Sequence, residues 1–287
     1  MKKYKIKSYC KVNLSLRVLN KRKDGYHNVK SLMTFCGLYD EIFIKRIRSS
    51  KDKVIFSGKF ATGINNKSNT ITQTLTLLRK KKFLKKKFFY INVKKNIPHG
   101  SGLGAGSSNA ANLLNFLNYK MNLNIGNREI KKIADQVGSD VSVSLKRQNT
   151  LLVGKKNQII RINNQFKLDL LIVYPNIICS TKRIYKFSDS SNFSKTYPNF
   201  NKITKKKLIY FLINEKNELQ KTVIKFYPRV KKIINIIKNQ YGCYFSRITG
   251  SGSSCIGVFA NPKAAIYTQK LIKLKFPKYW SVVSKTI

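Results

Sequence analysis

The chain has 287 residues, enough for two domains of ordinary size and for a core that needs no disulfide bonds. Lys and Arg number 58 against 11 Asp and Glu, which gives a formal net charge of +47. Lys, Asn and Ile together supply 107 residues while Ala supplies eight, and the frequent residues have A/T-rich codons. Genome composition therefore explains the charge, and we expect neither a nucleic acid nor a membrane as partner.

Apolar spacing predicts the elements of the first half of the chain. Alternation of apolar and polar residues is typical of strands, and a spacing of three to four residues is typical of helices. In chain order we expect strands over 3–18 and 28–47 joined by a turn at 21–25, a strand over 54–56, a helix over 70–79, a strand over 88–93, and helices over 107–121 and 130–137.

The second half predicts a similar mixture of elements. We expect strands over 150–153 and 168–174, a polar excursion over 188–201, two helices within 219–237 divided at Pro228, strands over 245–248 and 255–259, and a final helix and strand. Helices and strands mixed in this way indicate α+β architecture. We place a boundary near residue 155, between an N-terminal domain (1–155) and a C-terminal domain (156–287).

A glycine-rich segment, residues 96–111, carries the strongest functional signal. Glycines occupy alternate positions from 100 to 106, where they let backbone amides approach a ligand, and Ser107, Ser108 and Asn109 then open the predicted helix. Because unsatisfied amides at a helix start favour an anion, the segment predicts a phosphate cradle. It lacks the Gly-Lys-Ser/Thr ending of a Walker A loop and the acidic residue expected beyond a dinucleotide-binding loop. A flexible turn with an ordinary helix cap is the alternative.

Three further sites are ambiguous on the residues alone. Asp140 follows a predicted helix and a glycine, so it can direct its carboxylate into a cleft or simply cap the next segment. Lys11 lies within an apolar strand, where an ammonium group needs a purpose. Tyr26 and His27 follow a predicted turn, and they can contact a ligand or begin the returning strand.

Several of these segments resemble motifs of a known family, the GHMP kinases. The matching segments are, in the order of the family, residues 11–14, 98–111 and 249–254. Residues 24–27, 107–111 and 138–141 resemble more narrowly the branch that acts on a cytidine-diphosphate derivative of methylerythritol in non-mevalonate isoprenoid synthesis. The resemblance implies transfer of a phosphoryl group from ATP to the 2-hydroxyl of that substrate. It also implies a two-domain GHMP kinase fold, with an N-terminal domain like that of a ribosomal protein and a ferredoxin-like C-terminal domain.

The resemblance also implies a role for each matched residue. Asp140 is the expected catalytic base, and Lys11 is the cation that keeps its carboxylate ionised. Mg²⁺ is expected with ATP, and its ligands are unknown, with Ser107 as one candidate. The expected ATP contacts are Asn69, Lys95, Pro98, Gly100, Gly102, Leu103, Gly104, Ala105, Gly106, Ser107 and Ser108. The expected substrate contacts are Asn13, Tyr26, His27, Thr181, Tyr185, Gly250 and Gly252.

Among the substrate contacts, the two tyrosines are expected on opposite faces of the cytosine, and His27 is expected to read its edge. The glycines at 250 and 252 either offer amides to the diphosphate or only close the domain interface. These assignments make the substrate a small molecule.

The sequence departs from the family pattern at three positions. Ala105 stands where glycine is usual and would crowd a phosphate at that amide, Cys10 replaces Ala, and Ser142 replaces Pro. None of the three removes a charge or a base. Two alternatives stay open: another GHMP kinase, of the homoserine or mevalonate type, or an RNA-binding protein, which the charge would suit.

Cysteine usage and the lack of long apolar runs indicate the compartment. The five cysteines are odd in number and form no CxxC pair, which is typical of reduced thiols. The first ten residues alternate Lys with apolar residues, unlike a signal peptide, and no later segment approaches about 18 uninterrupted apolar residues. We therefore expect a cytoplasmic protein.

Overall fold

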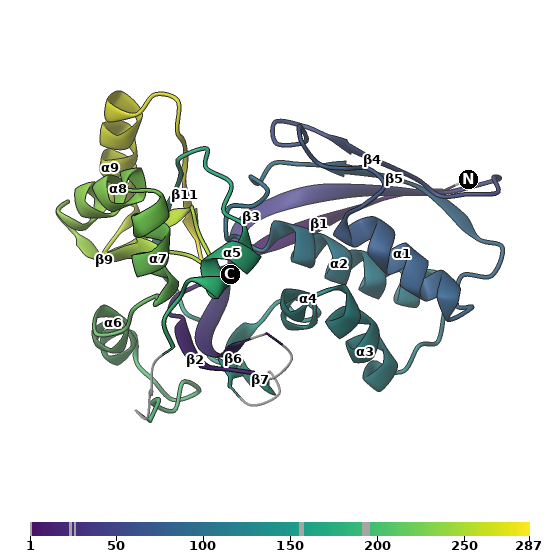
Figure 1. Cartoon of the computed structure of the whole chain (residues 1–287), viewed down its shortest axis with the longest axis horizontal. Coiled ribbons are helices and arrows are strands. Elements are labelled where there is room, and N and C mark those ends of the chain that lie inside the picture. Colours follow the sequence, from purple (N-terminus) through teal and green to yellow (C-terminus); the bar gives the residue numbers. More distant parts are fainter. Residues whose placement is uncertain (1, 23–24, 26, 155–157, 191–195) are drawn as a thin grey trace. The chain divides into compact units, whose positions relative to one another are not determined.

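The computed structural model describes residues 2–22, 25, 27–154, 158–190 and 196–287. Helices and strands are mixed along the chain, as expected for α+β architecture (Figure 1). The chain divides into two compact units. Unit 1 comprises Met1–Cys10, Leu38–His99 and Gly104–Arg147, and unit 2 comprises Lys11–Gly37, Gly100–Leu103 and Gln148–Ile287. Because each unit draws on several separate segments, the division of the sequence near residue 155 stays a prediction.

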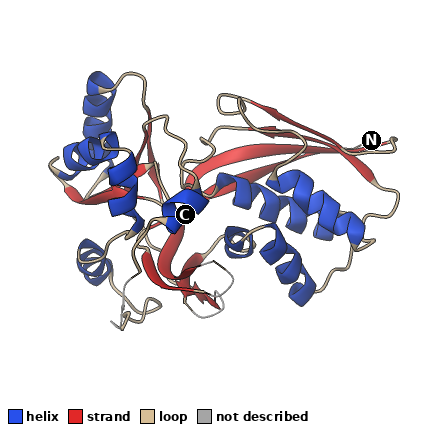
Figure 2. Cartoon of the chain, in the orientation of Figure 1, coloured by secondary structure: helices blue, strands red, loops and turns tan. Residues whose placement is uncertain are grey.

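Unit 1 packs helices against strands, which Figure 2 distinguishes by colour. Its elements are β1 (Lys3–Asn13) and β3 (His27–Ile47), which both continue into unit 2, β4 (Lys53–Ser57), α1 (Thr70–Lys80), β5 (Phe88–Lys94), α2 (Ala105–Lys120), α3 (Asn127–Val137) and α4 (Ser139–Ser144). β5 pairs antiparallel with the end of β3 and parallel with β4, and α1 connects β4 to β5. Apolar side chains from these strands and helices form the core, among them Ile44, Leu78, Ile91, Leu114 and Ile133.

Helix α1 shows how local sequence specifies an element of this unit. The side chain of Asn69 accepts hydrogen bonds from the amides of Ile71 and Thr72 at 2.9 and 3.0 Å, which caps the helix. Ile71, Leu75 and Leu78 recur at helical spacing and are all buried. The cap therefore fixes where α1 begins, and the apolar face fixes which side packs on the core.

Unit 2 contains two groups of strands. Its elements are β2 (Arg17–Lys21), β6 (Asn149–Val153), β7 (Gln158–Ile162), β8 (Asp169–Tyr174), α5 (Thr181–Lys186), α6 (Lys205–Ile213), α7 (Leu219–Phe226), α8 (Arg229–Lys238), β9 (Cys243–Ile248), β10 (Cys255–Phe259), α9 (Pro262–Lys275) and β11 (Trp280–Lys285). In the first group, β2 and β6 each pair antiparallel with the early part of β3, and β7 pairs with β6.

The second group forms an antiparallel sheet with the order β11-β8-β10-β9. Helices α7 and α8 precede β9, and α9 precedes β11, so the chain follows a β-α-β-β-α-β course. This is the ferredoxin-like arrangement expected for the C-terminal domain. Its core combines strand and helix residues, among them Leu171, Val223, Ile233, Phe259 and Ile272.

The structure differs from the sequence-based expectations in a few places. The strand expected over 3–18 is divided into β1 and β2, because the amides of Leu14 and Ser15 both turn to the carbonyl of Leu32, at 2.8 and 3.3 Å. The short elements α4, α5, α6 and β7 are not expected from the sequence, since 5 to 9 residues give little periodic signal. Pro228 divides α7 from α8 as predicted.

Two further expectations concern segments rather than elements. Residues 191–195 of the expected polar excursion lie outside the described residues. No helix in the described part of the chain has both the length and the apolar character that crossing a membrane requires.

Candidate active site

The glycine-rich segment enters α2 through backbone that glycine adopts most easily. Gly100, Gly102 and Gly104 have φ angles of 64°, 82° and 63°, in the left-handed region. Gly104 is the N-cap of α2 and has no side chain with which to bond the first amides of the helix. Gly106, in the first turn, is exposed. Backbone donors and the positive end of the helix dipole therefore lie at an accessible place, as a phosphate requires.

The predicted ATP contacts divide into exposed and buried positions. Gly100, Gly102, Gly104, Gly106 and Ser107 are at least partly exposed, whereas Pro98, Leu103, Ala105 and Ser108 are buried. The helix begins at Ala105, two residues earlier than predicted, so the backbone of Ala105 is helical and needs no glycine. Its methyl group is covered by protein, because the residue is only 5% exposed. The replacement of glycine at position 105 is therefore compatible with a phosphate cradle.

Ser108 connects α2 to the helix that carries Asp140. The hydroxyl of Ser108 donates to the hydroxyl of Ser144 at 3.3 Å, and Ser144 donates to the backbone carbonyl of Asp140 at 2.9 Å. Asp140 lies in the first turn of α4 rather than in an irregular turn, and it is half-buried. Within unit 1, two hydrogen bonds therefore connect the first turn of α2 to the backbone of Asp140, the predicted base.

Asn69 and Lys95, the other predicted ATP contacts of unit 1, are engaged with the protein itself. Asn69 caps α1, and Oγ1 of the following Thr70 donates to the carbonyl of Gly106 at 2.8 Å. This bond brings the starts of α1 and α2 together, so Asn69 lies beside the predicted cradle. The ammonium of Lys95 is 2% exposed and forms an ion pair with Asp40. The side chain of Lys95 is therefore directed into the protein.

In unit 2, Lys11 and Asn13 are joined to the second glycine loop, residues 249–254. Lys11 is 3% exposed, and its Nζ donates to Oδ1 of Asn13 at 2.7 Å. The backbone amide of Asn13 donates to Oγ1 of Thr249 at 2.9 Å, and its side-chain amide donates to Ser31 at 2.8 Å. These bonds hold the Lys11 side chain in one orientation at the start of that loop.

Helix α5 carries Thr181 and Tyr185 and holds them against other predicted substrate contacts. The hydroxyls of Thr181 and Ser251 lie 2.9 Å apart, which joins α5 to the second glycine loop. The rings of Tyr185 and His27 pack with centroids 5.5 Å apart and planes tilted by 32°. Burial, and to a smaller extent the charge of Lys21, lowers the pKa of His27. The imidazole is therefore neutral at pH 7 and has one donor and one acceptor nitrogen.

Gly250 and Gly252 belong to tight packing between two glycine segments of unit 2. A Cβ atom on Gly102 would lie 2.2 Å from the carbonyl oxygen of Thr249, and one on Gly250 would lie 2.6 Å from the carbonyl oxygen of Gly102. The amide of Gly252 donates to the carbonyl of Thr249 at 3.0 Å. That amide already has an acceptor within the loop. The absence of a Cβ at Gly102 and Gly250 is what permits the close approach of the two segments, whereas a Cβ on Gly252 would lie 3.2 Å from Cγ1 of Val223.

Two expectations for the site remain, the role of Tyr26 and the ligands of Mg²⁺. Tyr26 lies outside the described residues. Within the described ranges, no three His, Cys, Asp or Glu side chains are grouped so that they could hold a metal ion. Mg²⁺ typically takes one or two protein oxygens and completes its shell with phosphates and water. The hydroxyl of Ser107, partly exposed in the first turn of α2, fits that limited requirement.

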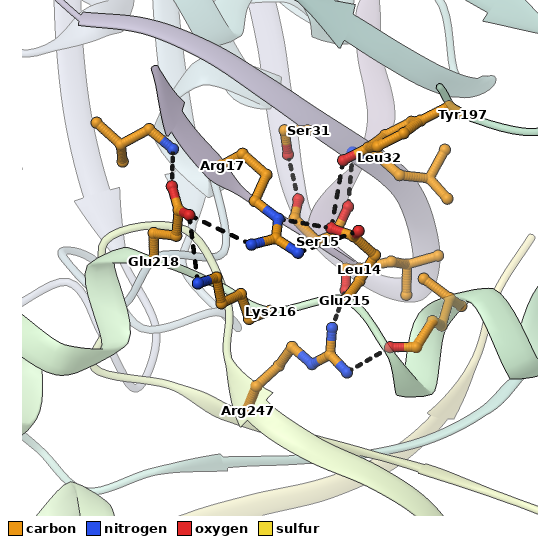
Figure 3. Close-up of polar contacts among 12 residues, drawn as sticks. Leu14, Ser15, Arg17, Ser31, Leu32, Tyr197, Glu215, Lys216, Glu218 and Arg247 are labelled. Carbon is orange, nitrogen blue, oxygen red and sulfur yellow. Dashed lines mark hydrogen bonds and ion pairs between the residues drawn. The ribbon is translucent and has the colours of Figure 1, made fainter. Parts of the chain in front are cut away.

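Sequence reasoning missed a buried charge cluster that fixes the chain after β1 (Figure 3). Arg17 donates from Nε to Glu215 at 3.0 Å and from Nη1 to Glu218 at 3.3 Å. Arg247 donates to the carbonyl of Leu14 at 3.2 Å, and burial lowers its pKa to about 10, which leaves it charged at neutral pH. The sequence offers one signal for this cluster: acidic residues are scarce in the chain, and two of them, Glu215 and Glu218, lie close together.

Comparison with known proteins agrees with the motifs. Residues 69–147 match the family described as GHMP kinases N terminal domain, and residues 205–268 match GHMP kinases C terminal. The 4-diphosphocytidyl-2-C-methyl-D-erythritol kinase of Pelagibacter ubique is 40% identical over 289 residues and covers 100% of both chains. The protein of that name from Caldicellulosiruptor bescii is 30% identical and covers 94% of both chains.

A solved structure shows the same fold. The crystal structure of 4-(cytidine 5'-diphospho)-2C-methyl-D-erythritol kinase matches with a TM-score of 0.77 and 21% identity, covering 98% of this chain and 99% of that chain. The predicted two-domain GHMP kinase fold is confirmed. Together with the full-length relatives, the match means that the chain belongs to the 4-diphosphocytidyl-2-C-methyl-D-erythritol kinase family of the GHMP kinases.

Proposed function

We propose that this chain transfers the terminal phosphoryl group of ATP to the 2-hydroxyl of 4-diphosphocytidyl-2-C-methyl-D-erythritol, in the cytoplasm. Relatives of that name that are 30–40% identical over nearly the whole chain support the reaction. The observation that carries the proposal is the path from α2, which begins at a glycine cap, through Ser108 and Ser144 to Asp140. A phosphate-binding helix end with a carboxylate nearby supplies what phosphoryl transfer to a hydroxyl needs.

The proposed reaction asks for positioning and charge more than for covalent chemistry. We assign to Asp140 the acceptance of the proton that the substrate hydroxyl loses as its oxygen bonds to phosphorus and ADP leaves. We assign to Lys11 the stabilisation of negative charge in that step. Lys11 suits this role because its ammonium is buried and oriented by Asn13.

The ATP phosphates are assigned to the start of α2. Gly104 and Gly106 leave room for close approach to the backbone amides, and the dipole of a 16-residue helix favours the anion. Mg²⁺ supplies neutralisation of the phosphate charge when it is bound. Ser107 is the oxygen donor of this chain that we propose for it, since its side chain is partly exposed in the first turn of α2. Asn69 is proposed as a further nucleotide contact, because it caps the helix beside this one.

The cytidine moiety is assigned to His27 and Tyr185. A neutral imidazole with one donor and one acceptor suits the cytosine edge, which also presents both. The ring of Tyr185 offers a face for stacking, and Tyr26 is proposed for the opposite face. Asn13, Thr181 and the second glycine loop are proposed to hold the remainder of the substrate. Hydrogen bonds among these groups already join them within unit 2.

The test is a coupled assay of ADP release with three acceptors: the cytidine-diphosphate substrate, homoserine and mevalonate. We expect turnover with the first alone. Turnover with homoserine or mevalonate at a similar rate would assign the chain to another GHMP kinase activity. Absence of turnover with all three, together with RNA binding that weakens steeply with added salt, would support the RNA-binding alternative instead.

A further inference from the structure

We propose that Asp40 is a positioning residue for ATP binding, because its carboxylate holds the start of α2 at a fixed distance from Asn96 and Ile97, the first residues of the glycine-rich segment. This inference rests on the proposed function, since it concerns how that site is held in shape. Asp40 lies in β3 and is 0% exposed. It acts through the backbone that it anchors and not by contact with the nucleotide.

Donors from four residues converge on the two oxygens of Asp40. Its Oδ1 accepts the backbone N–H groups of Asn96 and Ile97 at 2.8 and 3.0 Å. Its Oδ2 accepts the side-chain amide of Asn109 at 2.9 Å and the ammonium of Lys95. An ionised carboxylate offers about four lone-pair sites, so these donors fill its capacity.

The donors come from both ends of the glycine-rich segment. Asn96 and Ile97 follow β5 and lead into the glycines, whereas Asn109 lies in α2 just beyond its first turn. Glycine has little intrinsic preference for one backbone conformation, so the sequence of the glycines between them does not by itself set the spacing of the two ends. A single carboxylate that binds both ends limits their separation. The amides at the start of α2 are thereby kept in place before a phosphate arrives.

A neutral amide cannot take over this role. Asparagine at position 40 would have one accepting oxygen, and its NH₂ group would face donors whichever way it turned. Lys95 would become a 2% exposed cation without its counter-ion, a situation that proteins tolerate poorly. Asp40→Asn keeps the volume of the side chain and releases one or both ends of the segment.

Asp52 provides a matched control within unit 1. Its carboxylate accepts Nε and Nη2 of Arg79, each at 2.8 Å, and the backbone amide of Phe89 at 2.8 Å. Asp52 therefore anchors the beginning of β5 with a cation and a backbone amide, as Asp40 anchors the chain that leaves β5. Arg79 and Phe89 both lie outside the glycine-rich segment. The effect of Asp52→Asn therefore measures what the removal of a buried carboxylate anchor costs when the anchor does not hold the glycine-rich segment.

The experiment compares Asp40→Asn and Asp52→Asn with the unchanged chain at full length. Calorimetry gives the Kd of a non-hydrolysable ATP analogue, thermal unfolding gives the Tm, and steady-state kinetics give kcat and the KM of each substrate. We expect both variants to lower the Tm. Only Asp40→Asn should raise the Kd of the analogue and the KM for ATP, by about 10- to 100-fold, with the KM for the cytidine substrate unchanged. Equal effects of both variants on ATP, or none from Asp40→Asn, would overturn the proposal.

Asn109→Ala keeps the test decisive if Asp40→Asn does not fold. It leaves the ion pair between Asp40 and Lys95 intact, and it also removes Oδ1 of Asn109, a buried atom without a hydrogen-bond partner among the described residues. We expect a small change in Tm and a Kd for the analogue raised about fivefold. An unchanged Kd would again overturn the proposal. Because calorimetry needs no turnover, an unchanged chain that binds the analogue but does not phosphorylate the cytidine substrate would contradict only the proposed function.

Discussion

Replacement of Gly102 by Ala tests the tight packing of the two glycine segments in unit 2. Gly102 has a φ of 82°, a conformation that costs an L-residue roughly 1–2 kcal/mol. The new Cβ would also lie 2.2 Å from the carbonyl oxygen of Thr249 and 3.0 Å from the amide nitrogen of Gly252. Relief of such crowding costs typically about 1–3 kcal/mol. We therefore expect the free energy of unfolding to fall by about 2–5 kcal/mol.

Gly25→Ala is the control for this prediction. Gly25 has nearly the same φ, 83°, but no atom of the described residues lies within 4 Å of an added Cβ, so it carries only the backbone cost. Thermal unfolding should place the Tm of Gly102→Ala below that of Gly25→Ala by roughly 2–12 °C. The variant at 102 should also raise the KM of the cytidine substrate, because the displaced loop begins at the threonine that binds Asn13. Equal Tm values for the two variants would refute the reasoning from crowding.

Three further predictions concern the reaction and the substrate. Asp140→Asn preserves the shape of the side chain but removes the proton acceptor, so kcat should fall by about 10²- to 10⁴-fold while the Kd of an ATP analogue is unchanged. A variant that keeps its kcat would show that Asp140 is not the base. His27→Ala should raise the KM for the cytidine substrate and leave the KM for ATP alone, and equal rises in both would argue against recognition of the base. The third prediction is a pH dependence, because burial lowers the pKa of His27 from its usual 6.5. Protonation makes both ring nitrogens donors, so the KM for the cytidine substrate should rise as the pH falls through the lowered pKa of His27, and this rise should be absent in His27→Ala. The native state binds this proton less readily than the unfolded chain, so protonation of His27 also lowers the free energy of unfolding. The contribution of His27 to stability is complete above pH 6.5, and it is lost as the pH falls through the native pKa.

Elements with strong local signals could be predicted from the sequence. Helix α1 begins at Thr70 as expected, because its asparagine cap and its apolar face are both evident from neighbouring residues of the sequence. Helix α2 begins earlier than expected, since a serine cap and a glycine cap are both common and only the structure shows that Gly104 is used. The motifs were sufficient to identify the family, because their order and spacing extend over most of the chain.

Contacts between distant residues could not be predicted in this way. The family resemblance makes Lys95 an expected ATP contact, but its ammonium pairs with a residue 55 positions away. Arg17 and Glu215 lie 198 positions apart and meet only in the folded chain. Short helices raise the same difficulty, because α5 has six residues and its packing of Tyr185 against His27 has no periodic signature. Only the family resemblance indicated those two residues.

The rare acidic residues carry more information about charged sites here than the abundant lysines. Asp40 shares the inward face of β3 with Ile42 and Ile44, and strand alternation predicts that face from the sequence. A carboxylate on a buried face requires a cation and further donors, so its position indicates an anchor before any partner is known. The partner cannot be chosen from 47 lysines by inspection. Genome composition can add exposed lysines at little cost in stability, whereas a buried cation such as Lys95 depends on the carboxylate that pairs with it. The 11 acidic residues are therefore a better guide than the lysines to where the fold requires charge.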